Sequence, residues 1–237
     1  MRPGLSTTVA ALVLIAGCSG GADVDPAANS RADTERLLDR ASAGTAALRS
    51  VHMVADLRDD RTPVVVDVRV DLRTEDFTGT IDLRGTPVEL TRIGADLYVR
   101  TNARFLARTT GIGARIARSA AGKYLKGPAG DPRFEAFEGF LRLADPRPAL
   151  DDARGRVTRG PVESYRGEPV VPLSGPAEDR ASTSTLYLAE QGVPRVVRMV
   201  NDDAANGASV AYDRFDEPVD VRPPPGDEVV ELSPSKG

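Results

Sequence analysis

The chain has 237 residues, with 31 lysines and arginines against 35 aspartates and glutamates, so its formal net charge is −4. This slightly acidic balance argues against a nucleic-acid-binding protein, which needs a strongly basic surface. A single cysteine excludes an intrachain disulfide, so stability must come from a packed core. The length suits one large β-rich domain or two small ones.

The N-terminus has the layout of an export signal. Arg2 supplies a positive start, residues 5–15 carry no charge, and Cys18, the only cysteine, follows two small residues directly. The apolar stretch is too short for a permanent transmembrane helix. We therefore expect residues 1–17 to be a signal peptide that is removed from the mature protein.

Two small residues before a cysteine resemble the lipobox of bacterial lipoproteins, in which the thiol receives a diacylglyceryl group. The resemblance implies that Cys18 is lipidated, with acyl chains such as palmitate, and becomes the first residue of the mature chain. Two or more acyl chains anchor a protein stably. The expected location is the outer face of the cytoplasmic membrane, facing the extracellular or periplasm-like space. The alternatives are an ordinary secreted protein with an unrelated cysteine, or a buried free thiol.

The segment after the cysteine separates the anchor from the first ordered element. Residues 18–31 are rich in Gly, Ala, Asp and Ser without apolar periodicity, which predicts a flexible tether. A helix should then run from about Ala32 to Arg49, capped by Ser30 or Asp33. The apolar residues that share one face of this helix are Leu37, Leu38, Ala41 and Leu48.

From Ser50 the apolar period changes to two, which is typical of strands. The clearest run has four valines, at positions 64, 66, 68 and 70, alternating with three charged residues and Val65. This pattern predicts one buried and one solvated face. Short strands should also form at 51–57, 77–84, 87–93 and 96–101, so that residues 50–108 make one strongly curved antiparallel sheet.

The middle of the chain should cover the apolar face of that sheet. Helical spacing predicts one helix over 112–124 and a second over 134–143, with a short turn at 149–153. The second helix holds three of the six phenylalanines. These phenylalanines either plug the core or form an apolar lid over a ligand cavity.

Strands should return in the last third of the chain. The expected strands span 156–161, 163–173, 182–189, 194–201 and 208–215, with Asn206-Gly207 as a strong hairpin signal. The proline-rich tail over 223–237 should be extended. The predicted fold class is α+β, with a strongly curved antiparallel sheet, or incomplete barrel, wrapped around helices in a single domain over residues 32–222.

This order of elements resembles the LppX/LprA/LprF/LprG-type lipoproteins of mycobacteria and their relatives, whose domain is similar to the LolA-type lipoprotein carriers. The resemblance rests on residues 78–83 (TGTIDL), 96–100 (DLYVR), 122–126 (GKYLK) and 143–146 (LADP). Tyr124 departs from the Trp that such proteins often carry there. The resemblance implies a hydrophobic cavity between sheet and helices that holds acyl chains of lipids or lipoglycans, and no catalytic residues.

If the sheet and the phenylalanine-rich segment enclose a cavity, their inward-facing apolar residues should line it. The candidate ligand-binding residues are Val64, Val66, Val68, Val70, Ile81, Leu83, Leu97, Val99, Ile116, Phe137, Phe140, Leu186 and Leu188.

The residues themselves disfavour catalysis. His52 is the only histidine, so a catalytic triad or a metal cluster would have to assemble around the first strand. The aspartate pairs at 59–60, 151–152 and 202–203 fall at predicted turns, where this residue commonly bonds the local backbone. We therefore expect no enzyme, no cofactor and no metal. The function should be binding of a lipid or lipoglycan for transport or presentation, or that of an envelope sensor or scaffold that binds a protein partner.

Overall fold

The computed structural model describes residues 26–177 and 181–232. The expected signal peptide, Cys18 and the first part of the expected tether lie outside the described residues, as do residues 233–237. The first half contains α1 (Pro26–Ala46), β1 (Ser50–Asp59), β2 (Thr62–Asp71), β3 (Phe77–Leu83), β4 (Thr86–Ile93), β5 (Asp96–Arg100), α2 (Ala103–Thr109), α3 (Ala114–Ser119) and β6 (Tyr124–Pro128).

The second half begins with a chain of short helices and ends in strands. Its elements are η1 (Pro132–Phe134), α4 (Glu135–Glu138), η2 (Gly139–Ala144), α5 (Arg147–Ala153), β7 (Thr158–Arg159), β8 (Glu163–Tyr165), β9 (Glu168–Pro176), β10 (Thr183–Ala189), β11 (Val196–Asn201), β12 (Ala208–Asp213), η3 (Gly226–Glu228) and β13 (Val229–Glu231).

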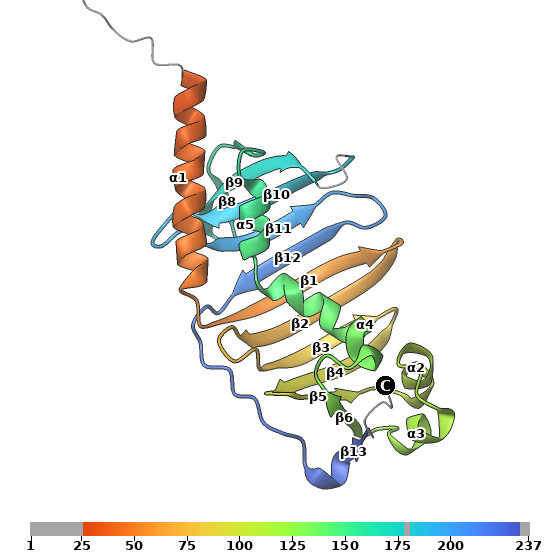
Figure 1. The fold of residues 1–237 in the computed structure, drawn as a ribbon. Helices are drawn as coiled ribbons and strands as arrows, with labels where there is room; N and C mark the ends of the chain where they lie inside the picture. Colours follow the sequence, from red (N-terminus) through yellow and green to blue (C-terminus); the bar gives the residue numbers. More distant parts are fainter. Residues whose placement is uncertain (1–25, 178–180, 233–237) are drawn as a thin grey trace, which may run out of the picture.

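All the strands belong to one sheet, in the order β13-β6-β5-β4-β3-β2-β1-β12-β11-β10-β9-β7, with β8 also paired to β9. The pairs are antiparallel except β13 with β6. Because β13 and β7 end the order, the sheet is open and not a closed barrel. Helices α4 and α5 cross one face of it, α2 and α3 lie near β6, and α1 stands along the β8–β9 end (Figure 1). The predicted α+β class with an open, mostly antiparallel sheet is confirmed.

The period-two pattern decides which face of the sheet is covered. In β2 the four alternating valines are buried, while the residues between them are exposed. We call the helix-bearing side the covered face and the opposite side the outer face. Tight turns fix the register: Asp60 and Arg61 both have positive φ, of 46° and 62°, as a two-residue type I′ hairpin turn requires.

The core lies between the covered face and the short helices. Side chains from most strands form one continuous apolar cluster with residues of the helices. The helical members include Leu38 of α1, Leu106 of α2, Phe134 of η1, Phe137 of α4 and Leu150 of α5. Gly127 of β6 lets this layer close, since a Cβ there would stand 2.7 Å from the Phe134 ring. The phenylalanine ring therefore packs directly on the strand backbone.

The first helix differs in its limits from the expected one. It starts at Pro26, so residues 26–31 of the expected tether are helical, and it ends at Ala46 and not near Arg49. Proline suits the first turn of a helix, and the alanines after it are strong helix formers. Gly44 lies against the backbone carbonyl of Pro194, which docks the end of α1 on the sheet.

The expectation of strand up to residue 108 is wrong, because β5 ends at Arg100. Asn102 then caps α2, its side chain accepting a hydrogen bond of 2.8 Å from the backbone N–H of Phe105. The helix expected over 112–124 is reduced to α3. Gly122, with φ of 73°, precedes Tyr124, which begins β6.

The C-terminal segment is part of the domain, which therefore continues beyond residue 222. After β12 the chain passes along the ends of the strands to β13 (Figure 1). There it pairs with β6, and the Leu232 side chain is buried in the core. Within the described part of the chain, no helix is long and apolar enough to cross a membrane.

Candidate ligand pockets beside the helical strap

A helical strap, defined as residues 139–153 (η2 and α5), crosses the covered face. Tyr212 of β12 pins it to the sheet, because the phenolic hydroxyl donates a 2.5 Å hydrogen bond to the carbonyl oxygen of Leu143. Only 2 % of Tyr212 is exposed. Burial, and secondarily the Asp145 carboxylate, raise the pKa of Tyr212 far above its usual range. The hydroxyl therefore keeps the proton that it donates to the strap.

The bend between η2 and α5 is held by a local ion pair. The backbone N–H of Arg147 and its guanidinium both donate to the Asp145 carboxylate, with Nη2–Oδ2 at 2.6 Å. Burial pushes the pKa of Asp145 upward, but the bonds and charge of Arg147 outweigh it, so the net pKa is lowered. Asp145 thus remains ionised beside the strap.

On one side of the strap lies what we call the apolar pocket, between α5 and strands β9 to β12. Its volume is about 460 Å³, within the range of roughly 300–1,000 Å³ that is usual for small-molecule sites. Asp152 and Arg156 are exposed, so they lie at the solvent side. The residues that line this pocket are Leu143, Ala149, Asp152, Ala153, Arg156, Val157, Gly175, Pro176, Ala177, Ser184, Thr185, Leu186, Met199, Val200, Asn201, Ala208 and Val210.

On the other side lies the charged pocket, of about 510 Å³, between η2 and strands β2 to β4. Half of its lining is ionisable: Asp71, Glu75, Arg92, Glu135, Arg142, Asp145 and Arg147. Several of these groups already have partners, such as Arg92 with Glu75 at 3.0 Å. An acyl chain here would meet ionisable groups beside the apolar half of the lining, and burying those groups without partners would offset part of its gain.

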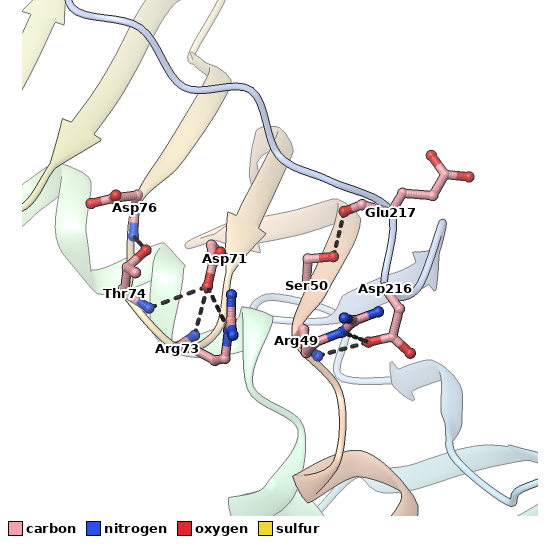
Figure 2. A network of polar contacts seen from close by, with 8 residues as sticks. All are labelled: Arg49, Ser50, Asp71, Arg73, Thr74, Asp76, Asp216 and Glu217. Atoms are coloured by element: carbon pink, nitrogen blue, oxygen red, sulfur yellow. Dashed lines mark hydrogen bonds and ion pairs between the residues drawn. The ribbon is translucent and has the colours of Figure 1, made fainter.

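The rim of the charged pocket includes the β2–β3 turn. Figure 2 shows the Asp71 carboxylate accepting hydrogen bonds from the backbone N–H groups of Arg73 and Thr74. The same view shows Asp216 accepting from the backbone of Arg49. The first contacts hold the β2–β3 turn, and the contact of Asp216 ties the exit from β12 to the start of β1.

The structure divides the predicted cavity-lining residues. Leu186 lines the apolar pocket and Val70 the charged pocket. The others line neither: Val64, Val66, Val68, Ile81, Leu97, Val99, Phe137 and Leu188 are buried in the core, and Leu83, Ile116 and Phe140 are half-buried against it. The Phe137 ring lies 6.5 Å from those of Phe105 and Phe134, between centroids. Phe105, Phe134 and Phe137 therefore pack against one another at the β6 end of the sheet.

Several pocket residues were not among the candidates. Met199 and Val210 are apolar residues on expected strands, and they lie in register with the predicted Leu186, which pairs with Met199, which in turn pairs with Val210. Their position on these strands therefore carried a signal. Ala149 and Ala153 of α5 carried none, because small residues on a short helix look the same over a core and over a pocket.

Val66→Asp should unfold the domain and not merely reduce ligand binding. Val66 is fully buried on β2 and lines neither pocket, so the new carboxylate would have no partner. Burying an unpaired charge destabilises by several kcal/mol, a large share of the ~5–15 kcal/mol that holds a typical domain together. Circular dichroism with urea denaturation measures this loss. Val65→Asp is the matched control, since Val65 is 41 % exposed on the outer face.

His52 lies on the outer face between two carboxylates. Its Nδ1 is 2.6 Å from Asp213 and its Nε2 is 2.8 Å from Asp67. Both ring nitrogens are thereby engaged in a structural network across β1, β2 and β12. Among the described residues, no group of three or more His, Cys, Asp or Glu side chains is arranged to hold a metal ion.

Comparison with known proteins places this architecture. The sequence matches no protein-family model and no curated protein. By structure, LprF from Mycobacterium bovis matches with a TM-score of 0.55 over 82 % of this chain and 98 % of its own, at 19 % identity. The Mycobacterium tuberculosis lipoprotein LppX matches with a TM-score of 0.53 over 79 % of this chain and 99 % of its own, at 15 % identity. This chain has the fold of these two mycobacterial proteins. The resemblance drawn from the sequence is therefore confirmed for the fold, over 79–82 % of this chain and nearly the whole length of each mycobacterial protein.

Proposed function

We propose that the protein is a membrane-anchored lipoprotein that binds a lipid or other acylated ligand, for transport or presentation in the cell envelope. The observation that carries the proposal is the apolar pocket between α5 and strands β9 to β12. The fold shared with the Mycobacterium tuberculosis lipoprotein LppX supports the same conclusion.

The pocket has the physical character that an acyl chain needs. Aliphatic side chains and Met199 form most of its wall, while Asp152, Arg156, Ser184 and Asn201 supply polar groups. Each methylene group moved from water into such a site gains roughly 0.8 kcal/mol. An acyl chain would lie against the apolar wall, and a polar headgroup would remain near the exposed Asp152 and Arg156.

The position of the pocket also suits a membrane anchor. Helix α1 leads toward Cys18 and contacts α5, which forms one wall of the pocket. A lipid anchor on Cys18 would therefore hold this end of the domain within reach of membrane lipids. The lipid anchor on Cys18 and the resulting membrane location are part of the proposal.

The test is direct extraction and uptake. The chain with Cys18→Ser, which carries no anchor of its own, is purified and its organic extract examined by mass spectrometry. We expect a co-purifying lipid, and saturable uptake of a fluorescent fatty acid by the delipidated protein. Absence of both would overturn the proposal and favour a sensor or scaffold module. That second candidate rests on the packed centre of the domain, where most predicted lining residues contact one another.

Tyr212→Phe should loosen the strap and speed ligand entry. The change deletes the hydroxyl that holds Leu143, which costs about 1–2 kcal/mol of stability because the carbonyl loses its donor. Stopped-flow uptake of the fluorescent fatty acid should be faster, and the urea midpoint lower. Tyr98→Phe on β5, several strands away, is the matched control. Unchanged uptake kinetics in a destabilised Tyr212→Phe protein would show that the strap is not the gate.

A further inference from the structure

A third pocket, of about 300 Å³, lies where the β8–β9 turn meets the start of β11 and the end of β12. It belongs to the outer face, because Val197 in its wall packs with Val170 and Ala189 in a small cluster distinct from the main core. We call it the arginine pocket. Its lining residues are Tyr165, Arg166, Glu168, Arg195, Val197, Tyr212, Asp213, Arg214 and Phe215.

The Asp213 carboxylate in this pocket is already occupied. Its Oδ2 accepts a hydrogen bond of 2.7 Å from Arg166, and its Oδ1 lies 2.6 Å from the His52 ring. Neither oxygen is left to neutralise the other two arginines. The remaining acid, Glu168, is exposed and forms no ion pair within the described part of the chain.

Arg195 is held in place but lacks a good acceptor. Its guanidinium stacks over the Phe215 ring, with Cζ 4.5 Å from the centroid. Its Nε is buried and has no hydrogen-bond partner in residues 26–177 and 181–232, while Nη1 reaches only the Val193 carbonyl at 3.5 Å. An unmet buried donor is unfavourable, and a half-buried guanidinium that is held against an aromatic ring is suited to binding an oxyanion.

Arg214 adds a second unpaired cation at the same pocket. It forms no ion pair with any described acid, and its backbone has a φ of 49°, which is unfavourable for a residue with a side chain. The segment after it is tied down, because Asp216 bonds the backbone of Arg49 and Ser50 donates to the Glu217 carbonyl (Figure 2). Strained backbone held by such surrounding contacts is often found at functional sites.

We propose that the arginine pocket binds an oxyanion, a phosphate or a carboxylate group. Arg195 donates through its Nε edge, Arg214 closes over the anion from the rim, and Arg166 adds positive charge while it holds Asp213. The bound group satisfies the buried Nε that the protein itself leaves without a partner. The site is on the opposite face from the strap and stands independently of lipid binding in the apolar pocket.

The oxyanion can come from free phosphate or from an anionic lipid headgroup, and the experiment separates these sources. The full chain with Cys18→Ser is titrated with inorganic phosphate by calorimetry, and separately mixed with vesicles of phosphatidylglycerol or phosphatidylcholine. Binding of phosphate without sedimentation on either vesicle indicates a free anion. Sedimentation with phosphatidylglycerol alone, reversed by added phosphate, indicates a headgroup.

Variants decide whether the pocket is responsible. Arg195→Ala should weaken binding at least about tenfold, because it removes the charge-assisted bonds. Arg214→Asn should also weaken it, and this exposed position tolerates Asn in the left-handed conformation without risk to folding. Arg104→Ala, an exposed arginine on α2 at the other end of the sheet, is the charge-matched control. No binding in either assay, or equal losses in Arg104→Ala and the pocket variants, would overturn the proposal.

Discussion

Ala149→Trp should abolish most of the ligand binding while leaving the domain folded. Ala149 lies on α5, half-buried, in the wall of the 460 Å³ apolar pocket. An indole ring there would occupy space that an acyl chain needs. If it displaces about three methylene groups, the loss is ~2.4 kcal/mol, or roughly fiftyfold to a hundredfold in affinity.

The measurement is fluorescent fatty-acid titration, paired with a urea denaturation curve for each protein. Ala121→Trp is the matched control, because Ala121 is exposed and lines none of the pockets described above. We expect the control to bind as the unmodified protein does. A folded Ala149→Trp protein with unchanged affinity would exclude the apolar pocket as the ligand site.

Cys18→Ser should release the protein completely from the membrane fraction. The lipid is expected on the thiol of Cys18, and serine offers only a weakly nucleophilic hydroxyl in its place. Without the diacylglyceryl group no stable anchor remains, since stable attachment requires at least two chains. Cell fractionation should find the protein with the original sequence in the membrane fraction and the variant in the soluble envelope fraction.

Intact-mass measurement completes this test. The protein with the original sequence should begin at an acylated Cys18. Ser19→Ala, the neighbouring control, should leave the acylation and the fractionation unchanged. If Cys18→Ser stays with the membranes, or if the protein with the original sequence carries no acyl mass, the anchor is excluded. The cysteine would then belong to an ordinary secreted protein or to a buried free thiol.

The sequence alone predicted the parts of the fold that depend on local chemistry. Side chains on a strand alternate between faces, so the four valines of β2 could be assigned to the buried side before any neighbour was known. The pairing of consecutive strands in hairpins could also be predicted, because short turns force neighbouring strands to pair. The resemblance to mycobacterial lipoproteins, which rested on such local patterns, also held for the fold.

Long-range pairing decided the elements that the sequence missed. Residues 112–124 have helical spacing, yet Tyr124 begins β6 because β5 on one side and β13 on the other offer backbone partners. The partner β13 comes from about a hundred residues later in the chain, so no local pattern could reveal it. The prediction of a membrane anchor, by contrast, rests entirely on the local pattern around Cys18.

The pockets, too, were decided by tertiary structure. Val66 and Met199 are both inward-facing apolar residues on strands, but Val66 meets the packed core and Met199 meets the apolar pocket. The alternating pattern predicts only that a side chain is buried. It does not distinguish burial against a neighbouring side chain from burial against a ligand. Which of the two occurs depends on where the strap crosses the sheet. The hydrogen bond from Tyr212 to Leu143 helps to hold the strap there, together with the packing of α5 against α1 and the core.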